Sequence, residues 1–224
     1  MEKILIGLVA PKQSGKDTIG DYLCNNYDFK KYNFADPLKE GMRKIFGFTD
    51  EQLYGNKKEV VDPFWGVSPR EVLQKMGTEI FQYEVPKNIP ELGDVGRSFW
   101  VKCFEKWYKE KSTQYEKVFS IWSNSIFEAM WKGLPHDFLN VQPYLRVVIS
   151  DIRFQHEADK IKDLGGILIR VSRDTQENSY SKHTSELENQ EILCDYIIDN
   201  NSNINQLYSS IDSLLKNFIK VHDI

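Results

Sequence analysis

The stretch LVAPKQSGKDTIG, at residues 8–20, constrains the fold more than any other part of the sequence. It approaches the phosphate-binding loop pattern G-x-x-x-x-G-K-[ST], which requires a strand before it and a helix after it. Lys3–Ala10 is a short apolar run that predicts a buried parallel strand. Asp17–Asn26 carries apolar residues at helical spacing and predicts the helix. The order of strand, loop and helix therefore predicts an α/β fold with a phosphate site in the loop.

Three residues of this loop suit phosphate binding. Gly15 has no side chain, so the backbone can approach an anion closely. Lys16 places a positive charge within reach of the β- and γ-phosphate oxygens of a nucleotide. Thr18 lies in the first turn of the predicted helix, whose unpaired N–H groups and dipole attract negative charge.

Two positions depart from the pattern. Ala10 stands where the first glycine is expected, and alanine is the smallest change from glycine. Asp17 stands where a Ser or Thr hydroxyl would contact Mg²⁺. A carboxylate is also a good magnesium ligand, and beside phosphates it would be repulsive unless a cation lay between them. We therefore interpret Asp17 as part of a metal-bridged site, the alternative being an acidic cap of the helix.

Strands and helices alternate along the rest of the chain. Strand character is found at 29–34, 145–153, 167–173 and 195–200, and helical character at 36–47, 68–81, 97–110, 156–164 and 204–218. Asp36 and Ser68 are the predicted caps of two of these helices. The alternation is typical of a parallel sheet flanked by helices, in which ligands bind beyond the carboxyl ends of the strands. Residues 113–143 are aromatic and predict an insertion, such as a helical hairpin.

Charged residues fall where such a site would need them. Asp151 lies near the carboxyl end of the strand at 145–153, and a carboxylate there commonly organises magnesium beside a phosphate loop. Basic residues are expected at loops or helix starts, namely Lys39, Arg70, Arg97, Arg153 and Arg173. Phosphoryl transfer needs cations to neutralise the transferred and the accepting phosphate groups. Each also fits an ordinary solvated charge, except Arg153, which comes two residues after Asp151.

Composition narrows the function classes. A chain of 224 residues suits one domain, and its net charge of −4 argues against attraction of the whole protein to nucleic acid. The three cysteines, Cys24, Cys103 and Cys194, are widely spaced and odd in number, which indicates free thiols in a reducing compartment. No segment approaches the roughly 18 apolar residues that a membrane span needs. We therefore expect a cytoplasmic protein.

Six short motifs follow one another along the chain: SGKDT, FADPLKE, REVLQKMGTE, RSFWVK, SDIRFQHEAD and RVSRD…HTSE. Together they resemble the deoxynucleoside monophosphate kinases of large DNA phages and viruses, over nearly the whole chain except 48–66 and 113–143. The resemblance implies a P-loop kinase fold and transfer of the γ-phosphate of ATP to a deoxynucleoside 5′-monophosphate, with Mg²⁺. It also implies that Asp17 is usual in this family and that Ala10 is the departure.

The resemblance assigns roles by position. For ATP it implies Lys12, Gln13, Ser14, Gly15, Lys16, Asp17, Thr18 and Arg173. For the acceptor nucleotide it implies Asp36, Lys39, Arg70, Gly77, Thr78, Arg97, Trp100, Arg153 and Glu157, with His156 also in pattern. The implied catalytic residues are Lys16, Asp17, Asp151, Arg153 and Arg173, of which Asp17 and Asp151 are the magnesium ligands, directly or through water. Arg173 begins an implied lid over 173–186, whose far end holds His183, Thr184 and Glu186. The alternative for His183 is a solvated side chain.

We expect one P-loop kinase domain over 1–224, with a core at about 1–47 and 144–224 and a substrate-binding helical region at about 36–112. Two alternatives stay open. One is another small-molecule P-loop kinase, of the phosphomevalonate or dephospho-coenzyme A type, because a phosphate loop does not identify the acceptor. The other is a non-catalytic nucleotide-binding protein that uses 113–143 as a partner surface. The expected ligands are small molecules, without direct nucleic acid or membrane, and a homodimer is left open.

Overall fold

The computed structural model describes residues 2–11, 13–132, 144–173 and 191–218. It divides into two compact units, each with its own hydrophobic core. Unit 1 comprises Met1–Tyr32 and Trp107–Ile224, and unit 2 comprises Asn33–Lys106. Unit 2 is thus formed by one continuous segment, whereas unit 1 is completed by residues far apart in the sequence.

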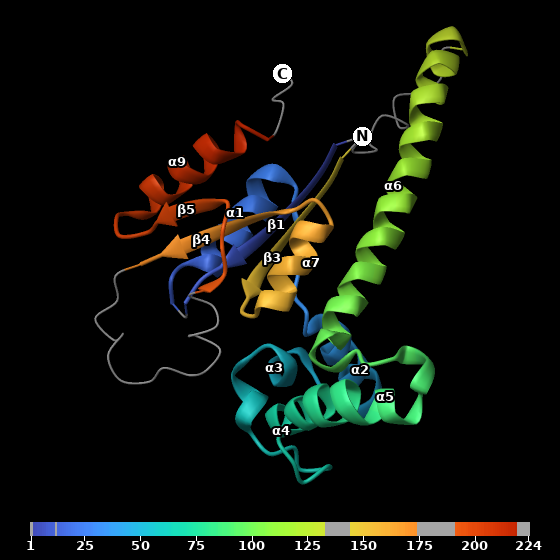
Figure 1. Ribbon diagram of the computed structural model, residues 1–224, viewed down its shortest axis with the longest axis vertical. Coiled ribbons are helices and arrows are strands. Elements are labelled where there is room, and N and C mark those ends of the chain that lie inside the picture. The colour runs from blue at the N-terminus through green and yellow to red at the C-terminus, as the bar shows by residue number, and fades with distance from the viewer. Residues whose placement is uncertain (1, 12, 133–143, 174–190, 219–224) are drawn as a thin grey trace. The chain divides into compact units, whose positions relative to one another are not determined.

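Unit 1 is built on a five-stranded sheet whose neighbouring strands are all parallel, in the order β2-β3-β1-β4-β5 (Figure 1). The strands are β1 (Glu2–Val9), β2 (Lys30–Tyr32), β3 (Tyr144–Ile152), β4 (Ile167–Ser172) and β5 (Tyr196–Asp199). Because β1 pairs with β3 and β4, it lies in the middle of the sheet, as its continuous apolar run predicted. The predicted α/β fold with a parallel sheet is confirmed.

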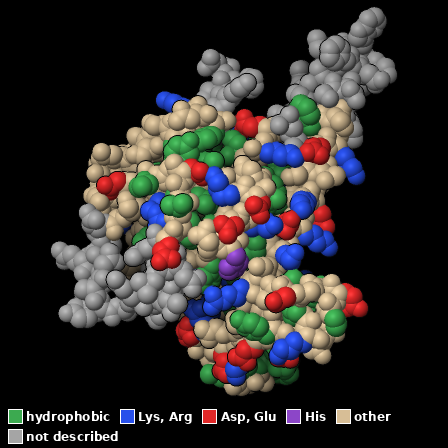
Figure 2. All heavy atoms as spheres, viewed as in Figure 1, with side chains coloured by type: hydrophobic (Ala, Val, Ile, Leu, Met, Phe, Trp, Pro, Cys, Tyr) green, Lys and Arg blue, Asp and Glu red, His purple; other side chains and the backbone are tan. Residues whose placement is uncertain are grey.

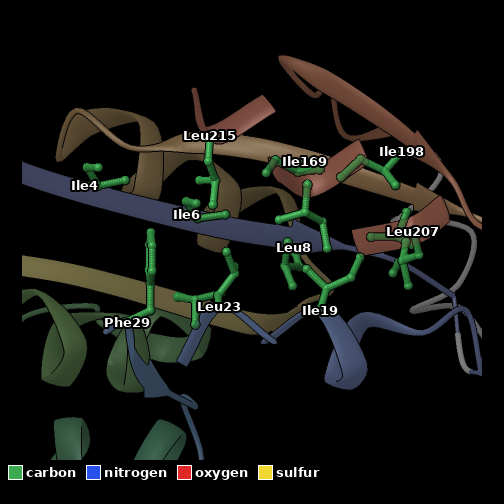
Figure 3. Packing of buried hydrophobic residues seen from close by; sticks show 14 residues of the cluster. Ile4, Ile6, Leu8, Ile19, Leu23, Phe29, Ile169, Ile198, Leu207 and Leu215 are labelled. Carbon is green, nitrogen blue, oxygen red and sulfur yellow. The ribbon is translucent and has the colours of Figure 1, made fainter. Parts of the chain in front are cut away.

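One face of this sheet packs against α1 (Lys16–Tyr27) and α9 (Ile204–Leu215), as Figure 3 shows. Alternate side chains of a strand point to the same face, and those of β1 that point to this one are Ile4, Ile6 and Leu8. The helices contribute the buried residues Ile19, Leu23, Leu207, Ile211 and Leu215. Because β1 and α1 share this core, both ends of the loop that joins them are anchored.

The other face of the sheet packs against α7 (Gln155–Asp163). Gly7 lies on this side of β1, where an added Cβ would come within 2.8 Å of Leu168 Cδ2 and 3.2 Å of Ile152 Cγ1. Ile161 of α7 is fully buried and lies 3.5 Å from the same position. A glycine here therefore lets α7 and the neighbouring strands close over the middle of β1.

Unit 2 is helical. Its helices are α2 (Asp36–Phe46), α3 (Asp50–Leu53), α4 (Pro69–Gln74), a π-helical segment (Lys75–Glu84) and α5 (Val85–Asn88), with short 3₁₀ turns at Asn56–Glu59, Pro90–Leu92 and Gly96–Ser98. The core consists of Leu38, Met42, Phe48, Leu53, Val72 and Leu73. Ser68 caps α4 as predicted, because its hydroxyl accepts a hydrogen bond from Glu71 N at 3.2 Å. Asp36 is not a cap: Ala35 holds that position, and Asp36 Oδ2 accepts from the backbone and side-chain nitrogens of Asn33.

The long helix α6 (Phe99–Lys132) differs from expectation. The sequence predicted a helix over 97–110 and a separate insertion from 113, but one helix of 34 residues runs through both. Residues 111–118, which link the two parts, contain no proline or glycine that would stop a helix. The rest of the expected insertion, 133–143, lies outside the described residues. Within the described part, no helix combines the length and apolar character that crossing a bilayer requires.

Replacement of Leu23 by alanine should destabilise unit 1. Leu23 is 1% exposed in the core that holds α1 on the sheet, so Leu23→Ala should lower the free energy of unfolding by about 3 kcal/mol. Leu193→Ala is the matched control, because Leu193 is 89% exposed, and its effect should stay within about 0.5 kcal/mol. Urea unfolding of both variants measures the difference, and equal effects would contradict this packing.

Candidate active site

The loop between β1 and α1 has the backbone geometry of an anion-binding turn. Gln13 and Gly15 both have positive φ angles, of 65° and 95°, and α1 begins at Lys16. Gly15 is the N-terminal cap residue and offers no side chain to the first turn of α1. The unpaired N–H groups and the positive end of the helix dipole therefore face the loop without obstruction from residue 15. Lys12 lies outside the described residues.

Asp17 is held between two lysines. Lys16 Nζ lies 3.0 Å from Asp17 Oδ2, and Lys31 Nζ of β2 lies 3.6 Å from Asp17 Oδ1. The hydroxyl of Ser150, a buried residue of β3, donates to Asp17 Oδ1 at 3.4 Å. Three separate segments of unit 1 therefore meet at this one carboxylate.

The Asp17 carboxylate suits a metal-bound phosphate site. Partial burial opposes its ionisation, but hydrogen bonds and charges from Lys16 and Lys31 outweigh this, so the pKa of Asp17 lies below its usual value. Magnesium is commonly held by one or two carboxylates together with phosphate oxygens and water. Among the described residues no cluster of three or more His, Cys, Asp or Glu could hold a metal. An ionised carboxylate with a hydroxyl beside it nevertheless fits the smaller donor set.

Asp151 and Arg153 form an ion pair at the carboxyl end of β3. Arg153 Nε donates to Asp151 Oδ1 and Arg153 Nη2 to Oδ2, both at 2.9 Å. This is the two-pronged geometry in which a guanidinium group binds a carboxylate. Since Ser150 precedes Asp151 and bonds to Asp17, the two predicted metal ligands come from adjoining segments of unit 1.

Glu157 has a structural task at the start of α7. Its Oε2 accepts hydrogen bonds from the backbone N–H groups of Arg153 at 2.8 Å and Phe154 at 3.1 Å. Burial raises the pKa of Glu157 to about 7, with the charge of Asp151 adding to the effect and the two backbone bonds opposing it. Glu157 therefore fixes the turn that carries Arg153, and its predicted contact with substrate stays a prediction.

The remaining residues predicted for ATP are placed as follows. Ala10 is buried and Thr18 half-buried, at the two sides of the loop. Arg173 directly follows β4 and is exposed. The lid that it was expected to begin, with His183, Thr184 and Glu186, falls in 174–190 and lies outside the described residues.

On the one face that Figure 2 shows, charge is not gathered into a single basic region. The net charge is −4, and basic and acidic side chains are interspersed on the face shown in Figure 2. Recognition of a phosphate must therefore depend on small local groups of cations. Lys16 and Lys31 form one such group in unit 1.

Unit 2 holds a second group of cations, Lys39, Lys58 and Arg70. Burial lowers the pKa of Lys58, and the positive charges of Arg70 and Lys39 lower it further. Mutual repulsion of this kind means that three positive charges face one neighbourhood. Lys39 Nζ also lies 4.2 Å from the ring centroid of Tyr54. Two of the predicted acceptor residues, Lys39 and Arg70, are thus brought together.

Other predicted acceptor residues have structural partners in unit 2. Trp100 donates its indole N–H to the Gly77 carbonyl at 3.0 Å and packs against the unit's core. A Cβ at Gly77 would lie 2.7 Å from Leu38 Cδ2, so the glycine permits close packing. Asp36 differs, because its Oδ1 is buried and has no hydrogen-bond partner among the described residues. Arg97 lies in the 3₁₀ turn before α6, and Thr78 lies on the π-helical segment.

Four residues at these sites were not predicted from the sequence. They are Lys31 and Ser150 at the Asp17 carboxylate, Lys58 in the cation group of unit 2, and Asn200 against the phosphate loop. Asn200 directly follows β5, so the rule that ligands lie beyond strand ends could have indicated it, whereas Ser150 lies inside β3. Lys58 falls in a stretch without a motif, and Lys31 sits in a strand so short that its orientation could not be inferred.

Comparison with known proteins gives a consistent result. The family model for deoxynucleotide monophosphate kinases matches residues 4–61 and 120–211. A protein of Acanthamoeba polyphaga mimivirus, assigned by name to these kinases, is 34% identical over 218 residues, covering 96% of this chain and 97% of that protein. The deoxynucleotide monophosphate kinase of Enterobacteria phage T4 is 24% identical over 238 residues, covering 95% and 98%. Among solved structures, dephospho-CoA kinase from Campylobacter jejuni aligns over 97% of this chain and 100% of that chain, with 15% identity and a TM-score of 0.46.

Glu157 should make stability depend on pH. The pKa of its carboxyl is raised from 4.5 to about 7 in the folded protein. The folded state therefore binds the proton more tightly than the unfolded state, and the contribution of Glu157 to the free energy of unfolding is largest at low pH and declines as pH rises through that interval. Glu157→Gln keeps an oxygen for both backbone N–H groups but cannot ionise. The free energy of unfolding of wild type should fall between pH 5 and pH 8 by about 2 kcal/mol more than that of Glu157→Gln.

Urea unfolding at the two pH values measures this difference. The exposed Glu91 provides the matched control, since Glu91→Gln removes the same charge from the surface. A Glu157→Gln variant whose stability differs from wild type by the same amount at both pH values would contradict the raised pKa.

Proposed function

The chain belongs to the deoxynucleotide monophosphate kinase family, and from this premise we propose how its residues divide the reaction. ATP is the phosphate donor, the acceptor is a deoxynucleoside monophosphate and the product is the diphosphate. The observation that carries the proposal is the Lys16–Asp17 pair at the start of α1, after a loop with two positive φ angles. That arrangement offers both a cation and backbone donors to a polyphosphate.

In this proposal the loop and α1 hold the donor. The N–H groups at the start of α1 bind the phosphate oxygens, and Lys16 exchanges its contact with Asp17 for the transferred group. The exchange is supported by the surroundings of Asp17, because Lys31, which bonds to Asp21 at 3.0 Å, lies 3.6 Å from the other oxygen of Asp17 and leaves a second cation beside it. Positioning and charge neutralisation supply most of the rate in reactions of this class.

We assign magnesium to Asp17 and Asp151, with Ser150 beside them. When bound, the ion neutralises charge on the phosphate oxygens and orients them. The pKa of Asp17 is lowered and Ser150 bonds to it, while Arg153 pairs with Asp151. We assign Arg153 and Arg173, which directly follow β3 and β4, to the negative charge of the transferred group. The lid over 173–186 stays a prediction, with the task of excluding water.

We assign the acceptor monophosphate to the cation group of unit 2. Lys39, Lys58 and Arg70 bring three positive charges into one neighbourhood, in which Glu59 bonds to Arg70 at 2.8 Å. Asp36 supports an acceptor in the same unit, because its buried Oδ1 lacks a partner among the described residues and can accept from a hydroxyl or amino group. Action without nucleic acid, a homodimer and a host-cytoplasm location stay predictions.

The test of the function is an ADP-release assay with ATP. The acceptors are the deoxynucleoside monophosphates, including dTMP, their ribonucleotide counterparts, phosphomevalonate and dephospho-coenzyme A, each with and without magnesium. Turnover should occur on deoxynucleotides and stop when magnesium is chelated. Lys16→Ala should lower kcat by about 100- to 1,000-fold, because a main charge on the transferred group is lost.

Lys216→Ala is the control for that variant, since it removes an exposed lysine at the end of α9. It should leave turnover unchanged. If the Lys16→Ala enzyme keeps most of its kcat, the assignment of this loop to the transferred phosphate is wrong. Turnover on phosphomevalonate or dephospho-coenzyme A alone would show that the acceptor is not a deoxynucleotide. ATP binding without turnover on any acceptor would show that the protein binds nucleotides without catalysis.

The acceptor assignment gives a separate prediction at Lys58. Lys58→Ala should raise KM for the deoxynucleotide by about tenfold, the equivalent of one charged contact, and leave KM for ATP unchanged. Lys57→Ala removes the same charge from the adjacent exposed residue and is the matched control. Steady-state kinetics with each substrate varied in turn would disprove the assignment if Lys57 and Lys58 behaved alike.

A further inference from the structure

Asn200 joins the last strand of the sheet to the phosphate loop. It directly follows β5, and its backbone N–H donates to Ser172 O at 2.8 Å, which extends the pairing with β4. The residue is 8% exposed, unusually buried for an asparagine. Its side-chain Nδ2 donates to the backbone carbonyl of Ser14 at 2.8 Å. This bond links residues 186 positions apart, so only the folded sheet creates it.

The contact lies directly against the turn that starts α1. An added Cβ at Gly15 would lie 2.4 Å from Asn200 Nδ2, closer than real Cβ atoms approach any neighbour. Gly15 also has a φ of 95°, which side chains rarely adopt. The loop therefore needs glycine for two independent reasons, and one of them is the presence of Asn200.

The other polar groups of Ser14 have weak hydrogen bonds or none among the described residues. Its hydroxyl is buried without a hydrogen-bond partner among the described residues, and its N–H reaches Pro11 O only at 3.4 Å. The bond from Asn200 is shorter and better placed than that contact. Asn200 thus fixes the orientation of the peptide group between Ser14 and Gly15.

Fixing this peptide has a consequence for phosphate. In a trans peptide the C=O and the following N–H lie in one plane and point in opposite directions. Since the Ser14 carbonyl is turned toward Asn200, the Gly15 N–H is turned away from it. That N–H precedes those at the start of α1, and a run of such groups is what binds an anion.

We propose that Asn200 is a positioning residue for the donor phosphates, acting through the Ser14–Gly15 peptide. The inference rests on the proposed function, because it assigns the loop to ATP. Asn200 itself touches the loop and not the reacting atoms. Its loss should leave the sheet folded and weaken ATP binding, without affecting the acceptor.

The variants are Asn200→Ala, which removes the hydrogen bond, and Asn200→Asp, which replaces the donor by an oxygen that repels the Ser14 carbonyl. Asn205→Ala is the control, since Asn205 is an exposed residue of α9. KM for ATP should rise about five- to tenfold in Asn200→Ala, as expected for one lost hydrogen bond, and further in Asn200→Asp. KM for the deoxynucleotide should stay close to wild type, and the melting temperature of Asn200→Ala should fall by only about 2–4 °C, as the loss of about 1 kcal/mol predicts.

A second measurement does not depend on activity. Hydrogen–deuterium exchange of the nucleotide-free protein should show faster exchange at residues 10–18 in both Asn200 variants and not in Asn205→Ala. Unchanged exchange there would overturn the inference even if activity fell. Faster exchange in a protein that does not turn over any nucleotide would keep the positioning role and reject the proposed function.

The contact with Gly15 gives an internal check on the mechanism. In the wild-type background, Gly15→Ala introduces both a steric clash with Asn200 and backbone strain from the positive φ. In the Asn200→Ala background it introduces the backbone strain alone. The fold-loss of ATP affinity caused by Gly15→Ala should therefore be smaller in the Asn200→Ala background. Equal losses in the two backgrounds would show that the two residues act independently and would overturn the inference.

Discussion

The left-handed turn at Gly15 is the constraint on which the site depends. A φ of 95° directs the chain from β1 into the first turn of α1, and the N–H groups of that turn are left without intrahelical partners. β1 and α1 cannot move apart to relax the turn, because both are packed in one core. The turn is thus held in a conformation that few residues accept, and we propose that it binds an anion.

The carboxylates around the loop are paired with cations. Asp17, in the first turn of α1, would repel a polyphosphate if it stood alone. Two lysines flank it, and Arg153 neutralises Asp151 in the same way. Each carboxylate therefore has a cation at hand before any ligand arrives. In the proposed mechanism, a nucleotide bound with its metal ion would exchange contacts with these existing pairs.

Unit 2 has a different physical basis. Its helices are short and enclose a small core of their own, to which Trp100 and Gly77 contribute packing and a hydrogen bond. Three cations gather on this unit, and burial, with the charges of Arg70 and Lys39 adding to it, lowers the pKa of Lys58. A cluster of that kind is costly without an anion, which is why we assign the acceptor phosphate to it.

The sequence by itself determined the parallel α/β sheet, the loop between β1 and α1, and the helix starts at Ser68 and near 97. These features depend on local patterns, namely apolar runs, turn residues and caps, which a sequence shows directly. The continuation of α6 past 110 was not predicted, although residues 111–132 contain no proline or glycine and Gly133 and Pro135 follow the last helical residue. Only the tertiary structure decided that Lys31 and Ser150 reach Asp17, that Glu157 is occupied by two backbone N–H groups, and that Asn200 lies on Gly15. Most of these contacts join segments far apart in the chain, and all of them depend on strand register, strand order and side-chain direction, which local sequence patterns do not specify.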